Sequence, residues 1–195
     1  AVAQNTLVFD PAEGETLTVA TRLTGATNVV ANSGASGGGI VQLLARYSDY
    51  TGVTSNNCGT LWPSFIGPGS EYGSLGGTGM ICLGKGTLKY TGQAGAINAP
   101  VVHTGGANDY TVYDIGEGSD LSLTGPVTLD TRLVKRGTGT LRFAREGTSS
   151  FFLQGGTAAT PNHINGCYRI NFNDNGDAPT QGGSGITVAE GTVSF

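Results

Sequence analysis

The stretch Leu133–Phe143 reads LVKRGTGTLRF, a glycine-spaced turn that runs into a short alternating strand. In this strand Leu141 and Phe143 lie on one face and the polar residues on the other. A nearly identical phrase, GKGTLKY, occupies residues 84–90, earlier in the chain. A turn-plus-strand unit that returns in this way predicts a stacked architecture, because one coil can bury its apolar face only against its neighbours.

Looser versions of the phrase occupy residues 13–19, 117–123 and 190–195. The spacing from Leu121 to Leu141 suits one coil of three short strands, with Val127–Leu129 on a second face. We therefore predict an all-β fold, a right-handed parallel β-helix or solenoid. An antiparallel β-sandwich is the alternative, since it would also give short strands and frequent turns.

Short apolar packets bounded by Gly, Asn, Asp or Pro predict the individual strands. Residues 40–47 fit either a strand or a single helical turn. The predicted strands are Thr6–Phe9, Thr16–Val19, Thr27–Val30, Met80–Leu83, Thr87–Thr91, Val101–Thr104, Tyr110–Ile115, Leu121–Thr124, Val127–Leu129, Leu133–Val134 and Leu141–Ala144.

The pattern predicts one solenoid domain over residues 1–195 with two interruptions. Residues 48–79 carry Pro63, Pro68 and many glycines, and we expect an irregular, loop-rich insertion there. Residues 157–184 read as a second insertion.

Composition excludes several classes of protein. Glycine accounts for 34 of 195 residues, about one in six against a usual share of roughly 7%, and these glycines mark turns. The charge is sparse, with 10 basic and 14 acidic residues and a net charge of −4, so no basic groove for nucleic acid is expected. No apolar run approaches the roughly 18 residues of a membrane-spanning helix.

The three cysteines are Cys58, Cys82 and Cys167. Cys58 and Cys82 flank a Gly/Pro-rich stretch, and a disulfide between them would bridge it, leaving Cys167 unpaired or bound to another chain. Three small buried apolar side chains are the alternative interpretation.

Aromatic residues gather in and around residues 47–72. Flat apolar faces of sugars pack on exposed rings, so Trp62, Tyr50 and Tyr72 are candidates for a glycan-stacking platform. A satellite core beneath a long loop, shared with Tyr47 and Phe65, is the interpretation that we favour.

Oxygen-bearing side chains alternate at Asn171, Asn173, Asn175 and Asp177, a spacing that suits a calcium loop. The twelfth position is Gly182 rather than the bidentate Glu of an EF-hand, and metal-free Asn/Asp/Gly turns are commoner. No cofactor other than calcium is expected.

Catalysis finds little support in the sequence. His103 and His163 have no neighbouring pattern for a nucleophile or a metal. The nearest cluster for acidic-polysaccharide chemistry is Asp130, Arg132, Lys135 and Arg136, which better suits a solvated turn. We expect that the protein is not an enzyme.

Residues 133–143, with the closing stretch GITVAEGTVSF at 185–195, resemble the autotransporter-associated β-strand repeat. That repeat opens with Leu-x-Lys-x-Gly-x-Gly-Thr-Leu and closes with a Gly-x-x-x-Val-x-x-Gly-Thr-Leu-like phrase. The resemblance covers residues 133–195, extends weakly to 84–91 and does not reach 32–79. It implies a parallel β-helix of bacterial surface proteins and autotransporter passengers, and its motif carries no catalytic residue. In this chain residues 157–184 replace the usual short joining segment.

The chain begins almost at once with an apolar strand and ends within another, Thr192–Phe195. Neither end reads as a cap, so we expect either a piece of a larger repeat protein or copies that stack end to end. The expected function is a structural or adhesive extracellular or bacterial cell-surface protein, a homo-oligomer or filament joined through its uncapped ends. A glycan-binding module or a polysaccharide-degrading β-helix enzyme is the alternative. Glycans or a host surface are further expected partners, whereas nucleic acid and membrane embedding are not expected.

Overall fold

The computed structural model describes residues 5–34, 38–67, 73–77, 79–105, 109–129 and 131–143. Beyond these it describes four short strands, at 152–153, 162–163, 186–188 and 192–194. All regular elements in the described residues are β-strands. In this described part of the chain, no helix is long and apolar enough to span a membrane.

The strands form three sheets that run along the long axis of the molecule. Sheet A contains β1 (Asn5–Phe9), β3 (Thr27–Ala31), β5 (Val53–Asn56), β7 (Met80–Leu83), β10 (Val101–His103), β13 (Val127–Leu129), β16 (Phe152–Leu153) and β17 (Asn162–His163). Sheet B contains β2 (Thr16–Val19), β4 (Ile40–Leu43), β6 (Thr60–Pro63), β8 (Thr87–Tyr90), β11 (Tyr110–Ile115), β14 (Arg132–Arg136) and β18 (Ile186–Val188). Sheet C contains β9 (Ala94–Ile97), β12 (Asp120–Leu123), β15 (Thr140–Phe143) and β19 (Thr192–Ser194).

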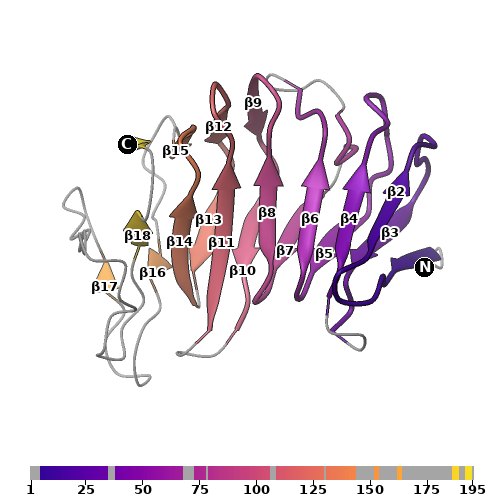
Figure 1. Ribbon diagram of the computed structural model, residues 1–195, viewed down its shortest axis with the longest axis horizontal. Helices are drawn as coiled ribbons and strands as arrows, with labels where there is room; N and C mark the ends of the chain where they lie inside the picture. The colour runs from indigo at the N-terminus through magenta and orange to yellow at the C-terminus, as the bar shows by residue number, and fades with distance from the viewer. Residues whose placement is uncertain are drawn as a thin grey trace.

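Strands of one sheet pair in parallel with the equivalent strands of the neighbouring coils. In sheet A, Val53 pairs with Met80, and Ile81 pairs with Val101 in the coil after that. Figure 1 shows the coils following one another in sequence order along the long axis, with sheet B in front of sheet A. The fold is therefore a parallel β-solenoid, as predicted, and the antiparallel sandwich is excluded. Among the described strands only β16 and β17 pair antiparallel.

The repeat spacing seen in the sequence is confirmed by the register. Leu121 pairs with Leu141 and Leu123 pairs with Phe143, so these residues stack in adjacent coils of sheet C. The two phrases of the family-like repeat stack in the same way, because β14 pairs with β18 and β15 with β19.

The glycine phrase marks a corner that leads into a strand, and it serves two different corners. Residues 13–19 and 84–90 lead into β2 and β8 of sheet B, whereas residues 117–123 and 137–143 lead into β12 and β15 of sheet C. The two closest copies of the phrase are therefore not stacked on each other. The phrase recurs because any tight corner of the coil needs a similar backbone.

Glycine is needed at the corner before β15 because the backbone of the previous coil lies too close for a side chain. A Cβ at Gly139 would lie against the carbonyl oxygen of Gly116. At Gly137 the φ angle is +74°, a left-handed conformation that favours glycine.

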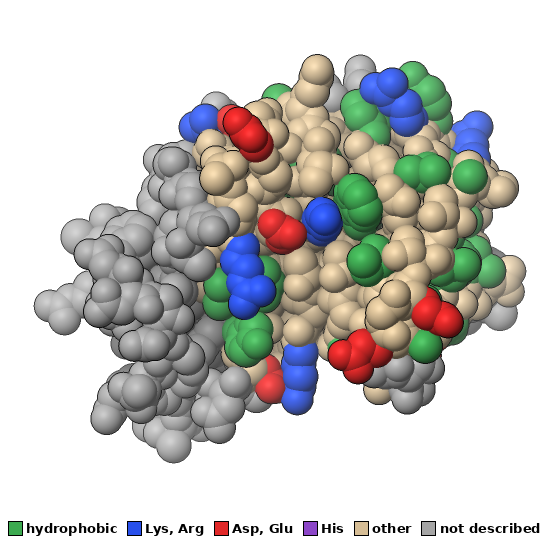
Figure 2. Space-filling view, viewed as in Figure 1, with side chains coloured by type: hydrophobic (Ala, Val, Ile, Leu, Met, Phe, Trp, Pro, Cys, Tyr) green, Lys and Arg blue, Asp and Glu red, His purple; other side chains and the backbone are tan. Residues whose placement is uncertain are grey.

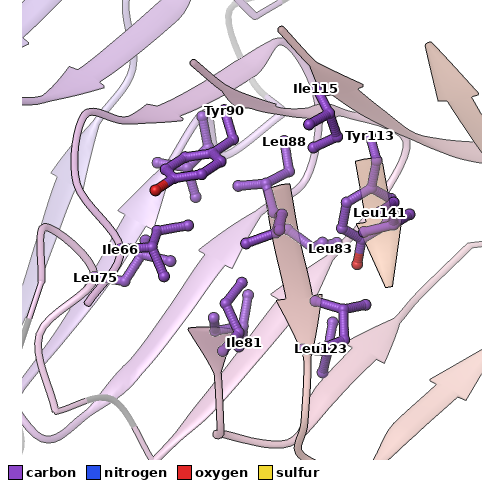
Figure 3. Close-up of a cluster of buried hydrophobic side chains, with 14 of the residues drawn as sticks. Ile66, Leu75, Ile81, Leu83, Leu88, Tyr90, Tyr113, Ile115, Leu123 and Leu141 are labelled. Carbon is purple, nitrogen blue, oxygen red and sulfur yellow. The ribbon is translucent and has the colours of Figure 1, made fainter. Parts of the chain in front are cut away.

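The core lies inside the coils, where alternate residues of the strands point inward. One column of sheet B runs through Val41, Leu61, Leu88 and Tyr113, each fully buried. Side chains from all three sheets meet inside the solenoid (Figure 3), among them Leu83, Leu88 and Leu141. Burying each large apolar side chain contributes roughly 1.5–3 kcal/mol, so the stacked columns dominate stability.

The segment predicted to be irregular, residues 48–79, contains a regular coil. Its strands β5 and β6 pair in register with the coils on both sides. The alternation of β5 is hidden because its inward residues, Thr54 and Asn56, are polar and yet fully buried. Asn56 accepts a hydrogen bond from the side-chain amide of Asn32 in the preceding coil (3.2 Å), which offsets the cost of its burial.

Of the two alternatives left open for residues 40–47, a strand or a single helical turn, the structure has the strand β4 at residues 40–43, followed by a turn. The strand β9 is absent from the sequence prediction, since its sequence AGAI has too few large apolar residues to show an alternation.

The last coil is much longer than the others. Leu133 pairs with Ile186, and their separation along the chain far exceeds that of Ile81 and Val101, which pair in an earlier coil. An insertion therefore lies between β15 and β18, where the sequence predicts an interruption at residues 157–184. Most of that segment lies outside the described residues.

Gly139→Ala should lower the free energy of unfolding by about 2–3 kcal/mol, because the new methyl group forces the corner away from the neighbouring coil. Gly79→Ala is the matched control, since a Cβ there would make only an ordinary contact at 3.4 Å. Urea unfolding followed by circular dichroism measures both variants. Equal stability of the two would contradict the close approach at Gly139.

Candidate functional site

The candidate glycan-stacking residues do not form one platform, and Tyr50 belongs to a small satellite core, which is the interpretation favoured from the sequence. Tyr50 is fully buried and packs with Leu23 and Val29. Its hydroxyl hydrogen-bonds to the Thr54 hydroxyl at 2.7 Å, and burial raises the pKa of Tyr50 to about 12. Tyr50 is therefore a core residue that no sugar can reach. Tyr72 lies outside the described residues.

Trp62 does lie on the outer face of the solenoid, in β6 of sheet B, where it is partly exposed. Its indole Nε1 donates a hydrogen bond to the Thr91 hydroxyl (3.1 Å). The ammonium of Lys89 lies 4.5 Å from the centre of the indole ring. The ring is thus held in one orientation, with a cation over it.

A second cation–aromatic pair lies close to the first along the chain. The guanidinium of Arg46 lies 4.4 Å from the centre of the Phe65 ring. The neighbouring Tyr47 is 68% exposed and Leu44 is 39% exposed. Figure 2 shows basic side chains beside hydrophobic ones on this face of the molecule. Sequence reasoning identified the aromatic residues but missed their cations, because Arg46 and Lys89 belong to different coils from the rings they contact.

The register explains how these residues meet. Gln42 of β4 pairs with Trp62 of β6. The neighbouring pair, Leu61 with Leu88, sets Lys89 beside Trp62 on the following strand. Residues from three successive coils thus form one outward column.

The predicted disulfide between Cys58 and Cys82 is not formed, and both are free cysteines. The register places Cys82 beside Ser55, whereas Cys58 lies past the end of β5. Burial raises the pKa of both thiols, and the charge of Asp10 adds to the effect at Cys58. Cys167 lies outside the described residues.

The predicted calcium residues Asn171, Asn173, Asn175 and Asp177 also lie outside the described residues. Within the part of the chain that the structure describes, no group of three or more His, Cys, Asp or Glu side chains is placed to hold a metal ion.

The charged cluster suggested for polysaccharide chemistry is divided between the inside and the outside of the coil. Lys135, predicted to lie in a solvated turn, is fully buried in β14, and its ammonium donates a hydrogen bond to the carbonyl oxygen of Gly137. Arg136, the next residue, is exposed. The prediction for Lys135 was wrong because the alternation of side chains along β14, and not the charge, decides that the Lys135 side chain points into the core. Asp130 lies outside the described residues.

The side chain of His103 lies inside the solenoid and links two of its sheets. Its Nδ1 lies 2.9 Å from the carbonyl oxygen of Thr128, which can only accept, so Nδ1 carries the proton. Its Nε2 then accepts a hydrogen bond from the Tyr113 hydroxyl (2.8 Å). Both side chains are fully buried, and burial raises the pKa of Tyr113. Because no solvent reaches this pair, it links sheets A and B and does not form an open catalytic site.

The first coil presents a different kind of candidate site, an open end of the core. Leu7 and Leu17 point inward but are each 39% exposed. Their partners in the next coil, Val29 and Val41, are fully buried. The strands β1 and β2 are the outermost members of their sheets among the described residues, so each has one unpaired edge there (Figure 1).

The described residues form a parallel β-solenoid with a mixed aromatic and basic outer face. No family model, curated protein or solved structure matches the chain.

Acid should destabilise the protein through His103. Burial lowers the pKa of His103 from 6.5 to about 4, partly opposed by the hydrogen bond to Thr128. Between these two values the unfolded chain binds the proton and the folded chain does not, so this contribution to stability is complete above pH 6.5 and falls as the pH drops. The expected loss is about 1.4 kcal/mol per pH unit, or about 3 kcal/mol over the window.

The measurement is the free energy of unfolding from pH 7 to pH 4, compared with that of His103→Gln. The difference between the two profiles isolates this histidine from the carboxylates. The variant should be less stable at pH 7 but should show a shallower decline. Parallel profiles would contradict a buried neutral His103.

Proposed function

We propose that this chain is a structural or adhesive extracellular surface protein, a β-solenoid unit that stacks end to end with a neighbouring coil or copy. The observation that carries the proposal is the open first coil. A parallel strand laid against β1 and β2 would satisfy their free edges and cover Leu7 and Leu17, as β3 and β4 do on the other side. The neighbour can be a further segment of the same polypeptide or a second copy, because the stacking chemistry is the same.

Composition and sequence resemblance support the location and the role. The low charge and the wealth of Gly, Thr, Ser and Asn suit a secreted β-rich protein, and the resemblance to autotransporter-associated repeats favours the bacterial cell surface. The buried His103 and Lys135 belong to the core, and this favours a structural role over an enzymatic one.

The free energy gained by stacking is small for each residue and adds up along the edge. Covering the exposed part of Leu7 or Leu17 contributes about 1 kcal/mol each, and the backbone hydrogen bonds of two added strands contribute about 1 kcal/mol each. Every 1.4 kcal/mol is about tenfold in affinity, so the affinity rises steeply with the length of edge that is paired.

Leu17→Lys should abolish association, because it places a charge on the inward face of the edge strand. The matched control is Thr18→Lys, which adds the same charge to the exposed outer face of the same strand. Sedimentation velocity over a concentration series, with negative-stain images, should show elongated oligomers for the unmodified chain and for Thr18→Lys. Purely monomeric unmodified protein at every concentration would refute stacking between copies, and undiminished assembly of Leu17→Lys would refute stacking through the first coil.

A further inference from the structure

Two cations near sheet B, Lys89 on its outer face and Arg46 past the end of β4, form no salt bridge among the described residues. The salt bridges found in the described residues are Arg22–Asp49, Lys85–Asp109 and Arg142–Asp120. In that same part of the chain, Arg46 and Lys89 contact aromatic rings and have no carboxylate within 4.0 Å. A ring attracts a cation through its quadrupole without cancelling the charge, so both groups keep their positive charge and their N–H donors.

The aromatic rings under these cations change which sugars can bind. A neutral sugar that stacked on Trp62 or Phe65 would displace a cation whose contact with the ring contributes about 0.5–1 kcal/mol. A sugar that bears a carboxylate gives the displaced cation a better partner, because charge-assisted hydrogen bonds are about twice as strong as neutral ones. The same rings then offer their surface to the apolar face of the sugar.

The site is rigid and broad enough for a polymer. Trp62 is fixed by its hydrogen bond to Thr91, and its neighbours in the column, Gln42 and Lys89, belong to the adjacent strands β4 and β8. Neighbouring strands are about 4.8 Å apart. Arg46 and the exposed Tyr47 extend the patch beyond the end of β4. Because β6 separates β4 from β8, a ligand that pairs with both cations must span more than one strand.

We propose that this patch, composed of Gln42, Arg46, Tyr47, Trp62, Phe65 and Lys89, binds a polysaccharide that carries carboxylate groups, such as a polyuronate. Lys89 and Arg46 pair with carboxylates, and Arg46 can do so with two parallel hydrogen bonds. Trp62, Phe65 and Tyr47 contact the sugar rings. This binding is independent of end-to-end stacking, because the patch lies on the outer face of sheet B and just beyond the ends of β4 and β6, whereas the stacking edge lies at the first coil.

One acidic residue weakens the site. Asp114 pairs with Lys89 in the register of β11 against β8, so its carboxylate lies on the same outward column. It repels an incoming carboxylate without forming a salt bridge to Lys89 within 4.0 Å. Arg136 follows Asp114 in the column and moderates this repulsion. Removing the charge of Asp114 should therefore give a modest gain in affinity.

The test measures binding of the full chain to defined oligosaccharides by isothermal titration calorimetry. The acidic probes are oligogalacturonate, an alginate oligomer and a hyaluronan oligomer, each of about eight sugars, and fully methyl-esterified oligogalacturonate is the uncharged match. At least one acidic probe should bind saturably, and the methyl ester should bind about tenfold more weakly or not at all.

The variants then locate the site. Arg46→Gln and Lys89→Gln should each weaken binding about five- to tenfold, and Asp114→Asn should strengthen it about twofold. Arg142→Gln removes the same charge from sheet C and should leave binding unchanged. Thermal unfolding of each variant verifies the fold.

Three outcomes would overturn the proposal. The first is no binding of any acidic probe at millimolar concentration, and the second is equal binding of the acid and its methyl ester. The third is an Arg142→Gln variant that weakens binding as much as Lys89→Gln, since general attraction between charges would then explain the result.

Discussion

Parallel backbone pairing between successive coils is the constraint on which the rest of this structure depends. Strands hydrogen-bond to the equivalent strands of the coils beside them, so a residue is fixed directly above its partner, as Leu121 is above Leu141. Because side chains alternate along a strand, this register sends the same positions inward in successive coils and builds continuous columns of buried residues. Corners and loops can then differ in length, from the tight turn before β15 to the long insertion before β18, without disturbing the columns.

The same constraint explains why polar residues occur inside the solenoid. Once the register fixes a position as inward, a polar side chain there must find its partners within the core. Asn56 bonds to Asn32 in the preceding coil, and His103 links the carbonyl oxygen of Thr128 to the hydroxyl of Tyr113. Lys135 donates to the carbonyl oxygen of Gly137. Because these groups are buried, they stabilise the fold and cannot contact other molecules. Any ligand or partner must therefore bind at the edges or on the outer faces.

The two proposed activities use the strand edges of the first coil and the outer face of sheet B. Among the described residues, the first coil has inward leucines that are partly exposed and strands with one unpaired edge, which another coil could cover. The outer face of sheet B presents residues that the core does not need, and it combines Trp62 and Lys89 from different coils into one column. A solenoid that both stacks and holds an acidic polysaccharide would be suited to a surface layer or an adhesive stalk.

Local patterns in the sequence were enough to predict the solenoid, most of its strands and the stacking of Leu121 on Leu141, because alternation and glycine corners act within a few residues. Met80–Leu83, Tyr110–Ile115 and Val127–Leu129 were predicted with their observed bounds. The coil of β5 and β6 could not be recognised, since Thr54 and Asn56 are polar residues whose burial depends on the surrounding coils. The register between coils also placed Tyr50 and Lys135 inside, kept Cys58 and Cys82 apart, and set Lys89 over Trp62. These outcomes depend on contacts between residues of different coils, and no local pattern encodes them.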